Sequence, residues 1–586
     1  MVKHTEKRPN VVFVITDDQG YPPLGCHGHP FIQTPYLDAF HRESVRFGQF
    51  HTGTTCAPTR AGLMTGHYCN STGVWHTIGG RSLLRRDEWS LATALAEVGY
   101  NTGIFGKWHL GDDYPYRPQD RGFQRVVVHG GGGISQQPDY WGNDYFNDTY
   151  MVDGDPMAFD GYCTDVFFRE ALAFIEENSE NSFFCYISTN APHAPWNVEP
   201  AYRDLYTGNT ESENYARFLG MITNIDDNFG RLREKLRELE LEDNTILIFM
   251  SDNGQTGVRG TEAAEMYNAG MRGLKGSPYD GGHRVPFLLR WPVAGLADGH
   301  TIKELTSYVD FMPTVRDLCG VDASGHHSFH GESLRPLLDG EIDGHWAERA
   351  IATDTQRVAH PVKWRLSCVM KDTWRLVNKL ELYNLADDPG QQHNVAAQHP
   401  SLVTELQQAY EDWWNLCSTQ NSEEIPISIG AEEQEIAVLR THDIRNEQDH
   451  STVWHQGQVR QGDPCHGWWE IMVEADGEYE FDLRRWPEEA GHRVRGSIEG
   501  EDVCFREDGI EPGMEFFYSG GVALDIDTAG LWVSGFPEQW APVSPEDRGA
   551  LIRMNLPAGP RHVRAQFASS SGFYSSAYYV YVRRVG

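Results

Sequence analysis

The stretch from residue 56 to residue 66, Cys-Ala-Pro-Thr-Arg-Ala-Gly-Leu-Met-Thr-Gly, combines a potential nucleophile with a potential anion ligand. Pro58 suits the first turn of a helix, which would place Cys56 at the helix N-terminus, where free amides and the helix dipole favour an anion or a nucleophile. Arg60 follows one helical turn later on the same face and could fork onto a tetrahedral oxyanion. Taken alone, the stretch better fits a buried structural cysteine beside a surface arginine.

Two acidic clusters, far apart in the chain, each follow a predicted buried strand. Continuous apolar runs predict these parallel strands. The first run, residues 10–16, ends at Asp17 and Asp18, and the second ends at Asp252 and Asn253. Open α/β sheets bind ligands at the carboxyl edge, where two buried carboxylates would need a cation, although a solvated turn is the alternative for the first pair. Together the four residues predict an all-oxygen site suited to Ca²⁺ or Mg²⁺ and unsuited to Zn²⁺.

Further basic side chains occur where predicted strands end. If the chain stays extended after residue 106, Lys107 and His109 point to the same side. His193 lies between two prolines, after the predicted strand 183–187, and is therefore rigidly presented. Each of these residues, taken singly, could equally be a structural side chain.

These motifs together resemble those of the type I sulfatases. The stretch at Cys56 has the family pattern Cys-x-Pro-x-Arg, residues 106–111 read Gly-Lys-Trp-His-Leu-Gly, and residues 191–193 read Ala-Pro-His. A fourth block, residues 275–286, resembles Lys-x(5)-Gly-Gly-x-Arg-Val-Pro. The resemblance covers roughly residues 8–420.

Two positions depart from the family pattern. His67 stands where arginine is usual after Leu-Thr-Gly, which puts in question how the helix is supported. Asp280 stands where glutamate is usual in the fourth block.

The resemblance implies a nucleophile and a metal. Cys56 would be oxidised to formylglycine by a formylglycine-generating maturation enzyme, and the aldehyde hydrate, bound to the metal, would attack sulfur. The implied ligands are Asp17, Asp18, Asp252, Asn253 and the matured Cys56, with Asp252 also acting as the base. Ca²⁺ is the expected ion and Mg²⁺ the alternative.

The resemblance also implies roles for the basic residues. Arg60, Lys107 and Lys275 would hold the sulfate oxygens, with Lys275 the last basic residue of the pocket. His193, alone or with Lys275, would protonate the leaving alcohol. His109 would take the proton of the second hydroxyl of the hydrate and so expel sulfate.

The expected substrate is a sulfated sugar or polysaccharide fragment. Residues 112–160, rich in Gly, Tyr, Trp, Asp and Asn, predict a long irregular recognition loop in which Tyr140 and Trp141 could stack on sugar rings. Six C-terminal tryptophans could form a carbohydrate-binding face or belong to the core: Trp454, Trp468, Trp469, Trp486, Trp532 and Trp540. The alternative functions are a phosphonate monoester or phosphodiester hydrolase of the same superfamily, and a catalytically silent glycan-binding protein.

The elements that would position these residues predict an α/β fold. We expect a large mixed sheet sandwiched by helices, alkaline-phosphatase-like, over residues 8–345, and a small α+β subdomain over 346–425. Alternating patterns beyond residue 430 predict an antiparallel, β-sandwich-like accessory domain over 430–586. Helices are predicted at 89–99, 163–177, 213–240 and 401–416.

Composition limits the partners and the compartment. With 84 acidic against 49 basic residues among 586, the surface should repel nucleic acid and anionic membranes. We expect neither a nucleic-acid partner nor a membrane span. The ten scattered cysteines suit a reducing compartment, and residues 1–8 are basic without an apolar signal region. The sequence as given therefore predicts a cytoplasmic protein, or a periplasmic one if a signal peptide was removed.

Overall fold

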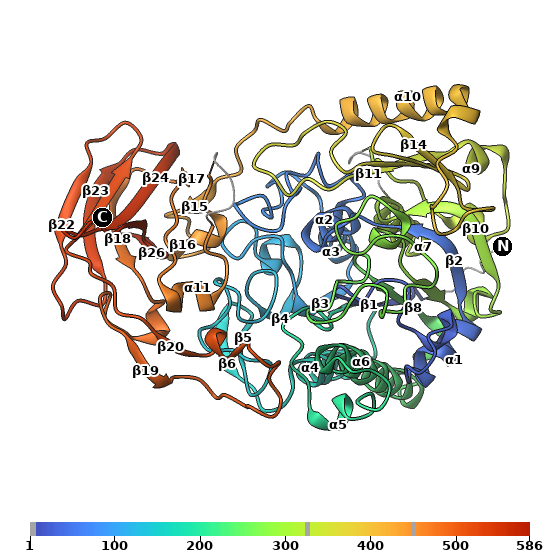
Figure 1. The fold of residues 1–586 in the computed structure, drawn as a ribbon, viewed down its shortest axis with the longest axis horizontal. Helices are drawn as coiled ribbons and strands as arrows, with labels where there is room; N and C mark the ends of the chain where they lie inside the picture. The colour runs from blue at the N-terminus through green and yellow to red at the C-terminus, as the bar shows by residue number, and fades with distance from the viewer. Residues whose placement is uncertain (1–6, 323–327, 447–451) are drawn as a thin grey trace.

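A ten-stranded mixed sheet forms the centre of the protein, which a computed structural model describes over residues 7–322, 328–446 and 452–586 (Figure 1). Residues 1–6 of the basic N-terminal segment lie outside this description. In spatial order the strands are β10 (Thr301–Ser307), β2 (Val45–His51), β9 (Phe287–Arg290), β8 (Thr245–Ser251), β1 (Asn10–Thr16), β7 (Phe183–Ser188), β3 (Asn101–Lys107), β4 (Arg125–His129), β5 (Thr149–Val152) and β6 (Asp155–Ala158).

The central strands of this sheet are parallel and buried on both faces. Strand β1 pairs in parallel with β7 and with β8. Its side chains alternate between two cores, because Val11 and Phe13 pack in one cluster and Val12 and Val14 in the other. A strand that is covered on both sides reads as a continuous apolar run, which is why residues 10–16 could be predicted.

Helices cover both faces, as predicted. In Figure 1, α4, α5 and α6 lie on one side of the sheet, and α2, α3 and α7 lie on the other. The helices of this region are α1 (Pro35–Glu43), α2 (Cys56–Thr65), α3 (Leu91–Glu97), α4 (Cys163–Glu177), α5 (Pro200–Arg203), α6 (Glu213–Glu238), α7 (Phe311–Leu318), α8 (Arg335–Leu338) and α9 (Gly344–Glu348). The predicted helix 89–99 is α3, which begins after the cap Ser90 and is followed by Gly99 with a φ of 90°.

The prediction of an irregular segment over residues 112–160 is wrong in part. Strands β4, β5 and β6 extend the main sheet there. The short β5–β6 pair has little apolar periodicity, because every residue of β6 is exposed. The apolar run from Val126 to Val128 could have indicated strand β4, and these three residues are buried.

A second, antiparallel sheet follows the main one. It contains β11 (Ala350–Thr353), β12 (Cys368–Lys371), β13 (Trp374–Val377) and β14 (Glu381–Asn384), and α10 (Pro400–Cys417) lies beside it (Figure 1). This is the α+β arrangement predicted for the region.

The C-terminal region contains two sheets around a shared core. One comprises β15 (Ile427–Ile429), β17 (Trp469–Val473), β24 (Gly559–Ala568), β21 (Thr528–Val533) and β22 (Gln539–Pro542), with β25 (Tyr574–Ser576) on β24. The other comprises β16 (Ile436–Arg440), β26 (Tyr579–Arg584), β18 (Gly477–Arg484) and β23 (Ala550–Leu556). Helix α11 (Gln456–Gln461) and the pair β19 (Ile498–Glu501) and β20 (Ser519–Gly521) lie beside them. The sandwich is largely antiparallel, although β15 pairs with β17 in parallel.

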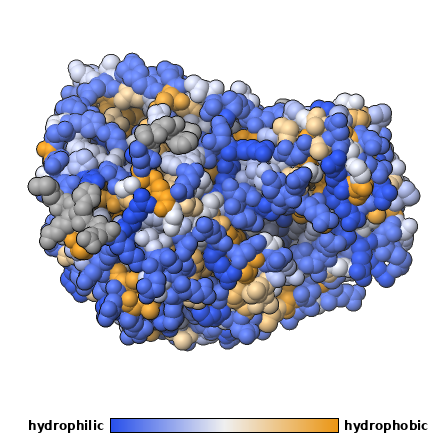
Figure 2. Space-filling model, turned by 180° about the vertical axis from the view of Figure 1, so that it is seen from behind, coloured by the Kyte–Doolittle hydropathy of each residue, from blue (hydrophilic) through white to orange (hydrophobic). Residues whose placement is uncertain are grey.

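One segment of the C-terminal region anchors it to the main domain. Ile510, Met514 and Phe517 are buried in the same apolar cluster as the helices below the main sheet. Arg506 donates to Glu199 over 2.8 Å. The outer surface is otherwise mainly polar on the face shown in Figure 2, with apolar residues in small groups. Among the described residues, none of the helices has the length and apolar character needed to cross a bilayer.

Candidate active site

The carboxyl ends of β1 and β8 lie side by side, since the two strands pair in parallel with Thr16 opposite Ser251. The acidic residues that follow these strands therefore meet, and the backbone amide of Asp18 donates to Oδ1 of Asp252 over 3.1 Å. The buried side chains at this junction are the four predicted oxygen ligands, Asp17, Asp18, Asp252 and Asn253.

The oxygen atoms at this junction fit a hard cation. Ligand atoms of Asp17, Cys56 and Asp252 lie within 4.8 Å of one another. Oδ1 of Asp17 and Oδ1 of Asn253 are buried and have no hydrogen-bond partner among the described residues. Buried oxygens without a donor are costly unless a cation binds them. Carboxylate and amide oxygens are the ligands that Ca²⁺ and Mg²⁺ prefer, so this set fits the predicted metal.

The pKa shifts of the carboxylates also favour a bound cation. Burial, followed by the charge of Asp17, raises the pKa of Asp252 to about 7. Burial also opposes ionisation of Asp18, but Lys275 and His193 outweigh it and hold the pKa of Asp18 well below its usual range. A divalent ion would add the positive charge that keeps Asp252 ionised as well.

Helix α2 begins at Cys56, as predicted, with Thr55 as its N-cap. Arg60 follows one turn later and is buried. Its Nη2 and Nε both donate to Oδ2 of Asp252, over 2.8 Å and 3.2 Å. Its Nη1 donates to the hydroxyl of Ser188 and, over 3.4 Å, to the carbonyl oxygen of Lys107. Most N–H donors of this guanidinium are therefore engaged within the protein. Arg60 thus orients Asp252 in addition to its predicted sulfate-binding role.

The two predicted lysines each reach one of the aspartates. Nζ of Lys107 donates to Oδ2 of Asp17 over 2.6 Å, and Nζ of Lys275 donates to Oδ2 of Asp18 over 2.7 Å. Lys107 is fully buried, whereas the side chain of Lys275 retains 12% of its exposure. Lys275 therefore marks the side of the cluster that solvent and substrate can reach.

The conformation predicted for His109 is wrong. Strand β3 ends at Lys107, and His109 has a φ of 62°, so the chain does not stay extended. The imidazole still belongs to the cluster, because burial, followed by the charge of Lys107, lowers its pKa well below the usual range. Its Nε2 lies 2.9 Å from the carbonyl oxygen of Thr77, which can only accept, so Nε2 carries the proton. Nδ1, buried and without a described partner, then holds a lone pair, so the predicted role of His109 as a base requires a bound anion to raise its pKa.

His193 has the opposite tautomer. Its Nδ1 lies 2.6 Å from the carbonyl oxygen of Ala194, and Nε2 lies 3.7 Å from Oδ2 of Asp18. Burial lowers the pKa of His193 to about 3, although Asp18 opposes this shift. The neutral ring offers a lone pair at Nε2, so its predicted role as an acid requires a bound anion to raise its pKa.

Gly132 is a site residue that the sequence did not reveal. A Cβ atom built on Gly132 would lie 2.3 Å from Cε1 of the His109 ring. The absence of a side chain at Gly132 therefore lets this loop pass directly against the imidazole. Thr77, which contributes a backbone carbonyl, also has no signal in its residue type.

We predict that Gly132→Ala displaces the His109 ring and lowers kcat/KM by about tenfold or more, because ångström displacements of catalytic groups cost factors of this order. Steady-state kinetics beside Gly133→Ala, whose Cβ would have no neighbour closer than 3.4 Å, would test this. Equal activity of the two variants would contradict it.

His67, which departs from the family pattern, forms an ion pair. Its Nδ1 lies 2.7 Å from Oε2 of Glu88. Burial opposes the charged ring, but Glu88 outweighs it and raises the pKa of His67 above its usual value. The helix that begins at Cys56 is thus tied to the loop before α3 by histidine in place of arginine.

We predict that this pair stabilises the protein by less than about 1 kcal/mol, as partly exposed pairs do. Because the folded-state pKa is raised, the stabilisation is fully present below pH 6.5 and is lost as the pH rises through the folded-state value. Urea unfolding of wild type and His67→Gln at pH 5.5 and pH 8.5 would measure it. A difference that is larger at the higher pH would contradict the assignment.

Trp141 cannot act as the predicted sugar-stacking platform. Its side chain is buried, its Nε1 donates to Asp502 over 2.9 Å, and the guanidinium of Arg460 covers its ring. The sequence could not show that the C-terminal region would cover this residue. Tyr140 beside it stays partly exposed and remains a candidate.

Asp280, the second departure from the family pattern, lies in a buried network and not at the metal cluster. Its Oδ1 accepts a hydrogen bond from Nε of Arg375 over 3.0 Å, and together with His51 and His283 it forms a compact group. The positive charge of Arg375 compensates the buried negative charge of Asp280.

Comparison with known proteins gives the family. Residues 9–321, more than half of the chain, match the sulfatase family model, and residues 275–414 match the N-sulphoglucosamine sulphohydrolase C-terminal model. Arylsulfatase A of Homo sapiens is 29% identical, over 68% of this chain and 86% of that protein. The N-acetylglucosamine-6-O-sulfatase of Bacteroides thetaiotaomicron is 24% identical, over 70% of this chain and 87% of that protein. The crystal structure of Ps i-CgsB in complex with k-i-k-neocarrahexaose superposes with a TM-score of 0.63 at 25% identity, over 72% of this chain and 95% of that one.

Proposed function

The chain belongs to the sulfatase family and is a sulfuric ester hydrolase, and we propose that its substrate is a sulfated carbohydrate. The observation that carries the activity is the convergence of Asp17, Cys56 and Asp252 within 4.8 Å, with Lys107 and Lys275 on the adjoining carboxylates. The carbohydrate is supported by the names of relatives, one an N-acetylglucosamine-6-O-sulfatase and one a structure with a bound neocarrahexaose.

Sulfatases generally use a formylglycine and a divalent metal, and we assign both to this cluster. When bound, Ca²⁺ (or Mg²⁺) would supply positive charge that lowers the pKa of a ligating hydroxyl. Its ligands would be Asp17, Asp18, Asp252, Asn253 and residue 56. Formylglycine, made from Cys56 by a formylglycine-generating enzyme, would supply a hydrated aldehyde as the nucleophile. Position 56 at the N-terminus of α2 suits a group that carries negative charge.

The remaining side chains bind the ester and move protons. Lys107 and Lys275 are cationic donors beside the cluster, and the guanidinium of Arg60 adds a third positive charge. These cations would neutralise the non-bridging sulfate oxygens as charge shifts onto the leaving oxygen. His109, neutral with a lone pair on Nδ1, could accept a proton once a bound sulfate has raised its lowered pKa. His193 is suited to deliver one after the sulfate has raised its pKa, and Lys275 can donate a hydrogen bond beside it.

We assign the sugar to a cleft whose wall includes the two neighbours of Thr77. It has a volume of about 260 Å³ and lies between the main domain and the C-terminal sandwich. Its wall includes residues 76 and 78, which flank the Thr77 carbonyl bound by His109, and residues 358–360, which follow Arg357. Arg357 lies close enough to Lys275 for its charge to affect that ammonium group. The cleft is thus linked to the site through the chain neighbours of Thr77 and Arg357, while the residues of the metal cluster do not line it.

The residues that line the cleft have the chemistry of a sugar site. Trp468 offers an aromatic face, and Nη1 of Arg81 has no hydrogen-bond partner among the described residues. Arg445 and Glu470 also line the cleft, where they form a buried ion pair with each other over 2.8 Å. Of the other five candidate tryptophans, Trp469 and Trp486 are fully buried and cannot contribute to a binding face. Trp540 is 47% exposed but does not line this cleft, so we assign carbohydrate contact in the cleft to Trp468.

Sulfate release from a panel of defined sulfated sugars would test the proposal. The matured enzyme should release sulfate from one sugar position, Cys56→Ala should release none, and Trp468→Ala should raise KM while it leaves kcat within a few-fold. Release from aryl sulfates alone would refute the carbohydrate assignment. Release of phosphate and not sulfate would favour the phosphonate or phosphodiester hydrolase, and glycan binding without turnover, with formylglycine confirmed at residue 56, would favour the silent binding protein.

A further inference from the structure

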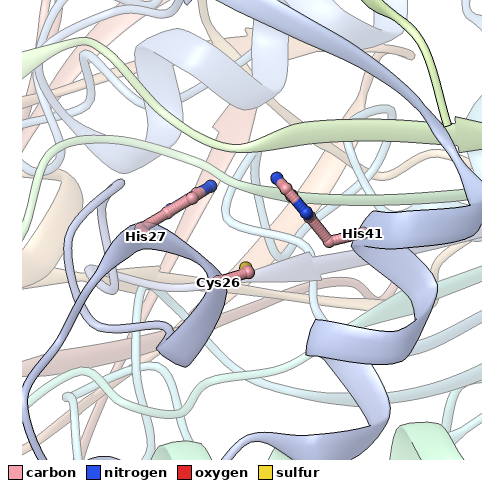
Figure 3. A group of neighbouring side chains, drawn as sticks. All are labelled: Cys26, His27 and His41. Atoms are coloured by element: carbon pink, nitrogen blue, oxygen red, sulfur yellow. The ribbon is translucent and has the colours of Figure 1, made fainter.

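A second group of metal-ligating side chains lies outside the active site. Cys26 and His27 belong to the short helix η1 (Gly25–His27), and His41 projects from α1. One ligand atom from each residue lies within 4.8 Å of the others. Figure 3 shows the two imidazoles turned toward each other, with the thiol of Cys26 below and between them.

The orientation of His27 is fixed as in a metal ligand. Its Nδ1 lies 2.6 Å from the carbonyl oxygen of Tyr21, which can only accept, so Nδ1 carries the proton and Nε2 presents the lone pair. The ring also stacks on Tyr21, with 3.8 Å between centroids and 4° between planes. Metal-binding histidines typically donate their second nitrogen to a carbonyl in this way, which sets the tautomer and the direction of the free nitrogen.

The protonation states suit metal binding. Burial lowers the pKa of His27 to about 3 and lowers the pKa of His41, so both rings are neutral near pH 7. Burial and then Asp38 raise the pKa of the Cys26 thiol, so the thiol keeps its proton until a cation displaces it.

The charges around the group are mixed. The positive charges of Arg42, Arg46 and Arg284 act on the two histidines and oppose a cation. The Asp38 carboxylate accepts a hydrogen bond from the backbone amide of Cys26 over 2.7 Å and favours one. The Cys26 thiolate and the Asp38 carboxylate would together provide two negative charges to balance a divalent ion.

We propose that Cys26, His27 and His41 bind a zinc ion, separate from the active-site metal. Thiolate and imidazole ligands select zinc over the hard cations that the all-oxygen cluster favours. Ligand atoms of a tetrahedral zinc site lie about 3–4 Å apart, so small side-chain rotations would close the present arrangement. The fourth position would face a surface pocket of about 360 Å³ that His27 and His41 line, where water can complete the coordination.

The position of the group gives the ion a structural role. The nine residues from Asp18 to Cys26 join the catalytic aspartates to this group, and His41 lies on a different element. A zinc ion would therefore fasten the loop after β1 to α1 and stabilise the loop that carries Asp17 and Asp18.

Cobalt(II) binding by the chelator-stripped full-length protein tests the proposal. Co²⁺ should produce a thiolate-to-cobalt charge-transfer band in the wild type, and added Zn²⁺ should abolish this band by displacing the Co²⁺. The band should persist in Cys56→Ala and Cys504→Ala and should be lost in Cys26→Ala and His41→Ala. Zn²⁺ should raise Tm in wild type and not in the last two variants. If circular dichroism shows that Cys26→Ala does not fold, the loss or survival of the band in His41→Ala tests the proposal by itself. Absence of the band in wild type, its survival in His41→Ala, or its loss in Cys56→Ala would overturn the proposal.

Discussion

The Cys56→Ser variant is expected to lose steady turnover by at least about a thousandfold, which corresponds to about 4 kcal/mol of barrier. Residue 56 lies at the N-terminus of α2, within reach of Asp17 and Asp252, so a serine hydroxyl would occupy the position of the nucleophile. Serine has one hydroxyl, whereas an aldehyde hydrate has two. A sulfate ester formed on serine would have no neighbouring hydroxyl to expel the sulfate, so the variant should stop after one turnover.

The measurement is the mass of the peptide that contains residue 56 after incubation with substrate. Cys56→Ser should gain one sulfate per chain, with a burst of alcohol release of the same amount. Cys69→Ser is a matched control, because Cys69 is another buried cysteine near α2, whose Sγ lies 3.5 Å from Oδ1 of Asn70, a contact that a serine hydroxyl can keep. Continuous turnover by Cys56→Ser would remove the two-hydroxyl mechanism.

Residues that follow buried strands were the easiest to predict from the sequence. Strand β1 is covered on both faces, and its unbroken apolar run revealed both the strand and the edge at which Asp17 lies. The parallel register of β1 with β8 then brings Asp252 to the same place. The chemistry of this junction follows from strand topology, which one sequence can indicate when the runs are long.

Residues whose position depends on loops and on distant chain segments could not be predicted in the same way. The left-handed backbone at His109 has no signal in the sequence, since a Lys-Trp-His run reads equally well as extended chain. Trp141 is covered by Arg460, more than 300 residues away in the sequence, and the partner of His67 is a glutamate that no motif marks. These contacts are tertiary, and residue type alone does not encode their geometry.

Removal of the active-site metal should affect activity and stability together. We expect Asp17→Asn to lower kcat/KM by at least about a hundredfold, or about 2.7 kcal/mol. Asparagine can still accept the hydrogen bond that Lys107 gives to Asp17 over 2.6 Å, but it lacks the negative charge that faces the ligand cluster. The variant therefore separates metal binding from packing.

The stability measurement uses Tm as a function of added Ca²⁺ after chelation. An ion that binds the folded state alone stabilises it by about 2.7 kcal/mol at a free concentration one hundred times Kd. Wild type should show this increase and recover activity, and Asp17→Asn should show neither at the same concentrations. His41→Ala, which removes a ligand of the second site only, should keep the Ca²⁺-dependent increase. Full activity of the wild type in metal-free buffer, or equal Ca²⁺ dependence in Asp17→Asn, would contradict the assignment of the cation to the junction of β1 and β8.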